Sequence, residues 1–177
     1  LLIQAFVVGQ NDSERHRSEL TEQVRFKEPQ VLPELLQGQW SSALILTFGA
    51  DLGFFEAHLL SQLAAVPLRI ILADDERLNE KFAEAVETGQ RLRRANRTYV
   101  AAAIRHPGSA HAKVILLTAA REGLLVIGSG NLGHSGYASP GELWSVFRYH
   151  SEDPRHLSEF VAGRAFGTAP GLVDTRG

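Results

Sequence analysis

The chain is predicted to form an α/β domain in which helices flank a mixed β-sheet, and two features of the sequence lead to this prediction. Apolar runs of strand length alternate along the chain with stretches in which apolar residues recur at helical spacing. The composition is that of a globular protein, with 177 residues of which 44% are hydrophobic and 21% charged. A chain of this length can bury one sizeable core, so a single domain over residues 1–177 is expected, and it contains no cysteine for disulfides.

Seven apolar runs are predicted to be β-strands because they are short and rich in β-branched and long aliphatic residues. They cover residues 2–8, 43–48, 68–73, 98–104, 113–119, 124–127 and 143–149. The first run has no basic flank and no small-residue cleavage site. It is therefore interpreted as a buried strand and not as a secretion signal.

Three helices are predicted between or after these strands. Each begins at an aspartate that can cap the first turn, namely Asp51, Asp75 and Asp153. In the third helix Pro154 takes the first helical position. Apolar residues at helical spacing are expected to face the core. They are Leu52, Phe55, Leu59 and Leu63 in the first helix, Leu78, Phe82 and Val86 in the second, and Leu157, Phe160 and Val161 in the third.

The remaining stretches indicate little about function. Residues 11–30 are interpreted as a loop or a marginal surface helix, and residues 167–177 as a tail or a linker to a further domain. No apolar run approaches the roughly 20 residues that cross a bilayer, so no membrane contact is predicted and a cytoplasmic location is expected. Because the chain begins at Leu1 and contains no methionine, it is expected to be a fragment or a processed chain.

The overall charge gives little indication of a nucleic-acid partner. The net charge is −2, so a nucleic acid would have to be held by a local basic patch. One such patch is predicted near the end of the second helix, at Arg91, Arg93, Arg94 and Arg97. Two interpretations stay open, because cations suit the C-terminus of a helix and the same side chains could follow a phosphate backbone.

Polar side chains suited to catalysis gather around two consecutive predicted strands. His111 and Lys113 stand two residues apart at the start of the fifth strand, so strand geometry places both on one face. Ser129 and Asn131 stand two residues apart where the next strand ends. A hairpin of the two strands would bring all four side chains together at one end.

This set of groups suits the cleavage of a phosphodiester. An imidazole can attack phosphorus, while an ammonium, an amide and a hydroxyl hold the oxygens on which charge develops. Lys113 would supply the positive charge that a metal supplies elsewhere, so neither a metal nor another cofactor is predicted. Gly128 and Gly130, which flank Ser129, are expected to let the backbone approach the substrate closely.

The spacing of these residues resembles the HKD motif of the phospholipase D superfamily. In that family His-x-Lys is followed by an Asp and then by Gly-Ser-x-Asn, which here correspond to His111-x-Lys113 and Gly128-Ser129-x-Asn131. The family's Asp falls at Thr118. This Asp is mainly structural in the family, so its loss leaves open either an active enzyme or a catalytically dead copy. The resemblance implies the family's layered sandwich, a mixed sheet with flanking helices.

Further expectations come from the same resemblance. Glu142 matches the downstream acidic residue that orients the nucleophilic imidazole in the family. The chain has a single His-x-Lys, so it resembles the one-motif bacterial group of small nucleases and of nuclease domains in restriction and helicase-linked proteins. In that group two chains share one site, where one histidine forms a phosphohistidine and the other protonates the leaving oxygen. The resemblance implies a homodimer that cleaves DNA as an endonuclease, and it leaves room for a further domain or a helicase-type partner.

Other interpretations of the same segment stay open. Gly128-x-Gly130-x-x-Gly133 fits a dinucleotide fingerprint, but that fold needs a helix next, and the sequence predicts a turn-rich stretch and then a strand. His134 could contact the substrate or be an exposed loop histidine. A lipid phosphodiesterase would need an apolar rim, for which Tyr137 is the one candidate in the motif loop. The last alternative is a non-catalytic binding or dimerisation domain.

Overall fold

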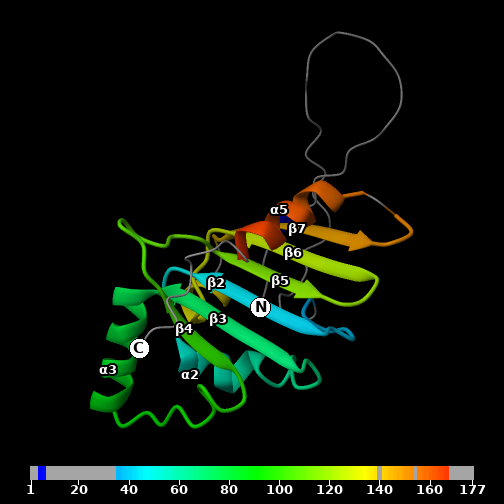
Figure 1. The fold of residues 1–177 in the computed structure, drawn as a ribbon. Helices are drawn as coiled ribbons and strands as arrows, with labels where there is room; N and C mark the ends of the chain where they lie inside the picture. Colours follow the sequence, from blue (N-terminus) through cyan, green and yellow to red (C-terminus); the bar gives the residue numbers. More distant parts are fainter. Residues whose placement is uncertain (1–3, 7–34, 139–140, 154, 168–177) are drawn as a thin grey trace.

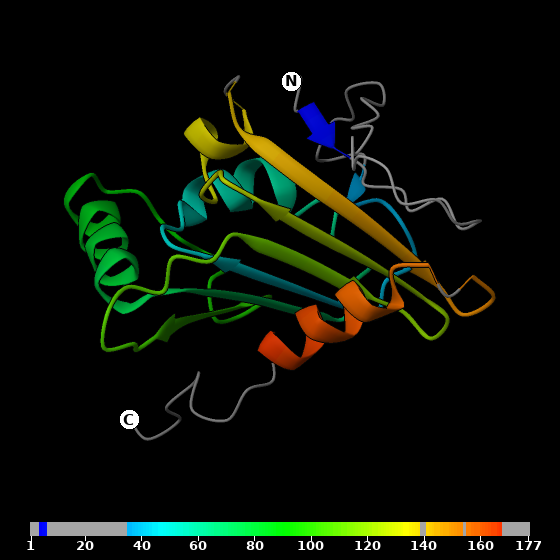
Figure 2. The ribbon, with the colours of Figure 1, turned by 90° about the horizontal axis from the view of Figure 1, so that it is seen from above.

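The chain forms a seven-stranded mixed β-sheet with helices against both faces (Figure 1, Figure 2). The computed structural model describes residues 4–6, 35–138, 141–153 and 155–167. The strands are β1 (Gln4–Phe6), β2 (Ser42–Thr47), β3 (Leu68–Asp74), β4 (Val100–Ile104), β5 (Val114–Thr118), β6 (Glu122–Gly128) and β7 (Leu143–His150). The helices are α2 (Leu52–Phe54), the π-helical turn η1 (Phe55–Leu59), α3 (Asp75–Glu87), α4 (His134–Tyr137) and α5 (Leu157–Gly167). All seven predicted strands are confirmed within the described residues.

The two halves of the sheet run in different senses. β2, β3 and β4 are parallel, whereas β5, β6 and β7 form an antiparallel meander that joins the parallel half where β5 pairs with β2. β1 pairs with β7 in parallel, which gives the order β1-β7-β6-β5-β2-β3-β4. The carboxyl ends of β2, β3, β4 and β6 therefore meet the amino end of β5 at one edge of the sheet, called here the carboxyl edge.

Two helical segments cover opposite faces of the sheet. α2 and η1 pack on the larger hydrophobic core, and α5 lies on the other face against β6 and β7 (Figure 2). The predicted cap of the first helix is confirmed, since the Asp51 carboxylate accepts a hydrogen bond from the Phe54 N–H at 2.8 Å. Its predicted apolar stripe is also confirmed. The four side chains are at most 3% exposed: Leu52, Phe55, Leu59 and Leu63.

The second predicted helix, α3, differs from the prediction in its cap and in one residue of its inward face. Its cap is Asp74, whose carboxylate accepts from a first-turn N–H at 3.4 Å, and Asp75 is the first helical residue. Leu78 and Ala85 are buried, but Val86 is 81% exposed, so its predicted inward position is wrong. With 3.6 residues per turn, Val86 lies about 80° around the helix from Leu78, whereas Ala85 lies only about 20° from it.

The third predicted helix begins later than the sequence indicates. The Asp153 carboxylate accepts from the Arg155 N–H at 3.2 Å and pairs with the Arg155 guanidinium, which closes a turn before the helix. His156 follows with a left-handed φ of 61°, so α5 begins only at Leu157. The predicted start at residues 153 and 154 is therefore wrong, and residue 154 itself lies outside the described residues.

An aromatic ring anchors α5 to the sheet. Phe160 is 6% exposed, and a Cβ on Gly123 of β6 would lie 2.1 Å from its ring, so the ring fills the space above this glycine. Leu157 and Val161, predicted in the same stripe, are 40% and 54% exposed. Their predicted burial is wrong because they lie about 60° and about 100° around the helix from Phe160.

Residues 11–30 and 168–177, which were predicted as a loop or surface helix and as a tail or linker, lie outside the described residues. Gly167, predicted as the start of that tail, is instead the last residue of α5. Within the described ranges, no helix has both the length and the apolar character to cross a bilayer.

The inward face of α3 can be tested with two truncations in the same helix. Leu78→Ala removes a buried side chain and should lower the free energy of unfolding by about 2–5 kcal/mol. Val86→Ala changes an exposed residue and should alter it by less than about 0.5 kcal/mol. Urea unfolding followed by circular dichroism measures both, and comparable losses in the two variants would contradict the orientation of α3.

Candidate active site

The β5–β6 hairpin brings the predicted His and Lys together at the carboxyl edge. Val114 pairs with Ile127, and the Gly128 N–H donates to the Lys113 carbonyl at 3.0 Å. The Lys113 Nζ lies 2.9 Å from the Nδ1 and 3.2 Å from the Nε2 of His111, and it donates to the His111 carbonyl at 3.2 Å. An ammonium thus contacts an imidazole directly, with no carboxylate between them.

Lys113 is held in a partly desolvated position. It is 8% exposed, which is uncommon for a lysine. Burial lowers its pKa, and the nearby Glu142 carboxylate acts in the opposite direction and raises it. The balance of these two effects sets the pH up to which Lys113 carries its positive charge.

Phe48, which the sequence did not indicate as a site residue, packs against both side chains of this pair. Its half-buried ring lies 4.6 Å from the His111 ring, measured between centroids, and 5.7 Å from the Lys113 Nζ. Phe48 directly follows β2, the strand that pairs with β5. An aromatic residue at a strand end was the signal available, but its contact with His111 depends on pairing between distant segments.

Ser129 and Glu142 form a second contact at the same edge. The Ser129 hydroxyl donates to the Glu142 carboxylate and accepts from the Leu143 N–H, the latter at 3.0 Å. The resemblance had implied that Glu142 orients His111. Among the described residues Glu142 instead hydrogen-bonds Ser129, and its link to the His–Lys pair is its effect on the charge of Lys113.

Asn131 has an unused acceptor beside the motif. Its Oδ1 is buried and has no hydrogen-bond partner among the described residues. The backbone next to it is fixed, because the Leu132 N–H donates to the Thr47 hydroxyl at 3.0 Å and the Leu132 carbonyl accepts from the Asp51 N–H at 2.8 Å. A buried acceptor without a partner is costly, so this oxygen suits a ligand group that donates a hydrogen bond.

The motif glycines pack against the protein itself. A Cβ on Gly128 would lie 2.2 Å from the Trp144 ring, and one on Gly130 would lie 2.4 Å from the Gly136 carbonyl oxygen. A Cβ on Gly136 would lie 2.0 Å from the Asn131 carbonyl oxygen. The close approach predicted for Gly128 and Gly130 toward a substrate is thus, in this structure, an approach toward Trp144 and the α4 backbone.

A helix that the sequence did not predict follows the motif. α4 is one turn long, and its first residue, His134, is exposed with its ring 6.3 Å from that of Phe54. The turn-rich stretch predicted here is therefore partly wrong. The dinucleotide interpretation still fails, because β6 and β7 are antiparallel and so cannot form the parallel crossover of that fold.

Tyr137 belongs to the core and not to a rim. It is 3% exposed, its ring packs 5.3 Å from that of Trp144, and burial raises the pKa of its hydroxyl. Its prediction as the apolar rim of a lipid site is wrong, because the close packing of α4 on the motif turns the ring inward.

Thr118 lies at the far end of β5 from His111. Its hydroxyl hydrogen-bonds that of Ser42 on β2 at 2.5 Å, and its carbonyl accepts from the Ser41 N–H at 2.7 Å. The position of the family's Asp is thus a link between two strands, distant from the His–Lys pair.

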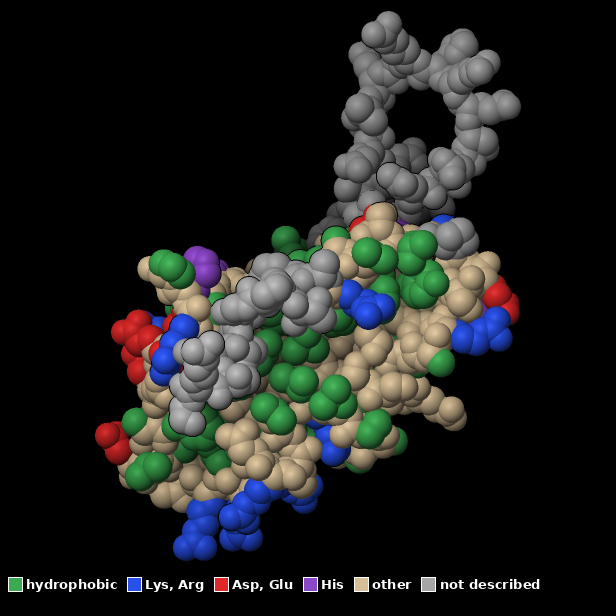
Figure 3. All heavy atoms as spheres, viewed as in Figure 1, with side chains coloured by type: hydrophobic (Ala, Val, Ile, Leu, Met, Phe, Trp, Pro, Cys, Tyr) green, Lys and Arg blue, Asp and Glu red, His purple; other side chains and the backbone are tan. Residues whose placement is uncertain are grey.

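The predicted arginine patch lies on a separate surface. α3 ends at Glu87, so the patch falls in the loop that leads to the amino end of β4, opposite the carboxyl edge. Figure 3 shows Lys and Arg side chains along the lower edge of the molecule, where Figure 1 places this loop. The backbone N–H of Arg94 donates to the Glu56 carboxylate at 3.1 Å. The structure does not bring the predicted Arg93, Arg94 and Arg97 to His111.

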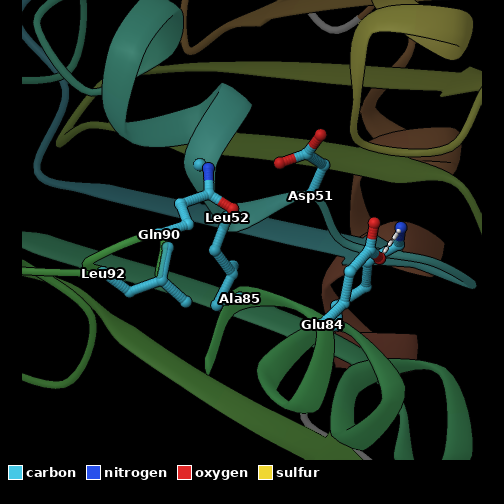
Figure 4. Close-up of a pocket in the computed structure, with 8 residues that line it drawn as sticks. Asp51, Leu52, Glu84, Ala85, Gln90 and Leu92 are labelled. Atoms are coloured by element: carbon cyan, nitrogen blue, oxygen red, sulfur yellow. Dashed lines mark hydrogen bonds and ion pairs between the residues drawn. The ribbon is translucent and has the colours of Figure 1, made fainter. Parts of the chain in front are cut away.

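A hollow of about 310 Å³ lies between α2 and α3, and the side chains of Asp51, Glu84 and Gln90 border it (Figure 4). Glu84 is paired with Lys81 there. The hollow does not include the His–Lys pair. In the described part of the chain, no three His, Asp or Glu side chains come together as a metal site.

The packing of α4 on the motif can be tested at Gly136. Gly136→Ala would drive a methyl group into the Asn131 backbone and should lower the free energy of unfolding by about 1–3 kcal/mol. Gly108→Ala is the matched control, since the nearest atom to its Cβ would lie at an ordinary 3.6 Å. Thermal unfolding measures both, and equal melting temperatures for the two variants would contradict this packing.

No family model and no curated protein matches the chain. Among solved structures it is similar to NucT from Helicobacter pylori, with 11% identity over 80% of this chain and 87% of that chain, and a TM-score of 0.55. It is also similar to Nuc from Salmonella typhimurium, a phospholipase D family member, with 16% identity over 82% of this chain and 88% of that chain, and a TM-score of 0.51. Yeast tyrosyl-DNA phosphodiesterase gives 16% identity over 65% of this chain, which spans only 27% of that chain, and a TM-score of 0.44. The chain has the phospholipase D-like fold, the layered α/β sandwich that its motif implied.

Proposed function

We propose that this chain is a metal-independent phosphodiesterase that cleaves DNA as an endonuclease. The observation that carries the proposal is the direct contact between the Lys113 ammonium and the His111 ring at the open edge of a phospholipase D-like fold. Ser129 and Asn131 follow β6 at the same carboxyl edge, where a hydroxyl and an amide N–H could donate to phosphate oxygens. The structurally similar proteins NucT and Nuc have names that suggest nucleases, which favours nucleic acid as the substrate.

In the free protein Lys113 is hydrogen-bonded to the His111 ring, whose lone pair has to attack phosphorus. An ammonium 2.9 Å from Nδ1 and 3.2 Å from Nε2 donates a hydrogen bond to whichever ring nitrogen is unprotonated, so that nitrogen cannot act as a nucleophile at the same time. A bound phosphodiester offers non-bridging oxygens that take over the Lys113 hydrogen bonds. Substrate binding itself would thus release His111 for attack.

Catalysis then needs two histidines in turn. The neutral His111 nitrogen forms a bond to phosphorus while the bond from phosphorus to the leaving oxygen breaks, and that oxygen takes a proton from the second histidine. Water, after giving a proton to the second histidine, attacks the phosphohistidine and releases His111. One chain supplies one histidine in this position, so we propose that a second protomer supplies the other, as a homodimer with a shared site.

The two alternatives are weaker on specific grounds. A lipid phosphodiesterase loses its rim candidate, since Tyr137 is buried. A catalytically inactive copy was suggested by the presence of Thr118 in place of the motif's Asp. Thr118 lies at the far end of β5, and the His–Lys pair is present with threonine at that position. A further domain or helicase-type partner stays a proposal, as does a cytoplasmic location.

Loss of the nucleophile should abolish activity without unfolding the protein. His111→Ala should give no turnover of bis(p-nitrophenyl) phosphate or of plasmid DNA in excess chelator, while the circular dichroism spectrum stays that of the wild type. Lys113→Ala and Asn131→Ala should each cost about 2–4 kcal/mol of transition-state stabilisation. Retained activity in folded His111→Ala protein would sink the assignment.

The charge of Lys113 should set the alkaline limit of activity. Glu142 raises the Lys113 pKa, so Glu142→Gln should lower that pKa, and the alkaline limb of the pH–rate profile should move to lower pH. Glu122→Gln is the control, because Glu122 begins β6 at the opposite end of the strand from Ser129. An alkaline limb that stays in place in Glu142→Gln protein would refute the electrostatic link.

The shared site predicts how activity falls when wild-type chains are diluted. In co-refolded mixtures with excess His111→Ala, every mixed dimer lacks either the nucleophile or the proton donor. Activity should therefore follow the square of the wild-type fraction. A linear fall, or a fully active monomer by analytical ultracentrifugation, would show that each chain carries a complete site.

A further inference from the structure

An open hollow adjoins His111 at the carboxyl edge. It measures about 700 Å³, is open to solvent, and lies between the first turn of α3 and the loop after β4. Phe48 is the wall that it shares with the His–Lys pair. Asp74 provides a second link, because its Oδ2 accepts from the Ala110 N–H at 2.9 Å, one residue before His111. The hollow and the candidate nucleophile are therefore held in a fixed relation.

Flat side chains line this hollow. They are the Phe48 ring, the guanidinium groups of Arg77 and Arg105, and the imidazole of His106. The Arg77 guanidinium carbon lies 5.6 Å from the centroid of the Phe48 ring. The His106 Nδ1 accepts from the Gly108 N–H at 3.1 Å, which fixes the imidazole at the rim. Aromatic, imidazole and guanidinium planes are the groups on which unpaired bases stack.

The charges of the hollow favour a base over a phosphate. Its acids already have partners, since Asp75 lies 3.4 Å from the Arg105 guanidinium and Glu76 lies 3.8 Å from that of Arg77. Little positive charge is left over to hold a phosphate in the hollow itself. An acyl chain would need continuous apolar walls, whereas Ile104 is the one large aliphatic side chain among the described lining residues.

From these observations we infer that the hollow is the subsite for the nucleobase next to the scissile phosphate, held by stacking against Phe48, Arg77 and His106. The inference rests on the proposed phosphodiesterase function and deepens it by locating the subsite that holds the base. A base stacked there would bring its phosphate to His111 and Lys113, because Phe48 contacts both of these side chains.

The contribution of the base can be isolated with three small substrates. The kcat/KM values for the 5′- and 3′-(p-nitrophenyl phosphate) esters of thymidine are each divided by that for methyl p-nitrophenyl phosphate. The leaving group and the His111 chemistry are common to all three, so each ratio reports what the nucleoside adds. His106→Ala and Phe48→Leu should lower one of these ratios by on the order of tenfold, the scale of base stacking.

A matched control exists at His150. Its Nδ1 also accepts from the N–H two residues further along the chain, at 3.2 Å, but it ends β7, away from the carboxyl edge. His150→Ala should leave both ratios unchanged. An equal fall in His150→Ala and His106→Ala would count against the subsite.

Binding separates this inference from the proposed function. A thymidine dinucleotide is titrated calorimetrically into His111→Asn protein, with and without His106→Ala. Binding weakened on the order of tenfold by His106→Ala supports the subsite even when no substrate is cleaved, in which case the phosphodiesterase proposal alone fails. Unchanged ratios together with unchanged dinucleotide binding would overturn the inference.

Discussion

The pairing register of β5 and β6 decides where the candidate catalytic side chains lie. Val114 stands opposite Ile127, so the residues just beyond both strand ends face one another at the carboxyl edge. Side chains alternate along a strand, and a slip by one residue would turn Lys113 to the other face of the sheet. The register is supported by two buried cross-strand pairs, Ile115 with Val126 in the larger core and Leu116 with Leu125 on the opposite face. The chemistry of this edge therefore depends on an ordinary hydrophobic pattern.

Close backbone packing then fixes what the register brings together. The segment after β6 packs closely against α4, and no room remains between them for a Cβ at Gly130 or Gly136. This packing is possible because glycine has no side chain. Trp144, 1% exposed, fills the space above Gly128 from the neighbouring strand. The Gly-Ser-x-Asn segment is thus held by close packing, which keeps the Asn131 Oδ1 in place without a hydrogen-bond partner among the described residues.

The sequence predicted the strands and the His–Lys pair well because both depend on local spacing. Apolar runs report burial directly, and two residues on one strand face need no knowledge of the rest of the fold. The helix faces were less predictable, since Phe160 of α5 is buried whereas Leu157 and Val161, expected in the same stripe, are exposed. Phe48 could not be assigned to the site from its position at a strand end, because its contact with His111 exists only once β2 pairs with β5. The partner of Glu142 was equally out of reach, since it depends on the path of the chain between β6 and β7.

The charges at the carboxyl edge favour an anion that replaces an internal contact. Burial disfavours the charged form of Lys113, and the carboxylate that opposes this effect, Glu142, is already engaged with Ser129. The ammonium therefore uses the His111 ring and carbonyl as acceptors, which are neutral and weaker partners than an anion. A phosphodiester is a better acceptor for the same donor, so its binding would strengthen the interactions of Lys113 and free the imidazole in one step. A carboxylate hydrogen-bonded directly to Lys113 would compete with the substrate. This gives a physical reason for Glu142 to act on Lys113 through its charge while it hydrogen-bonds Ser129.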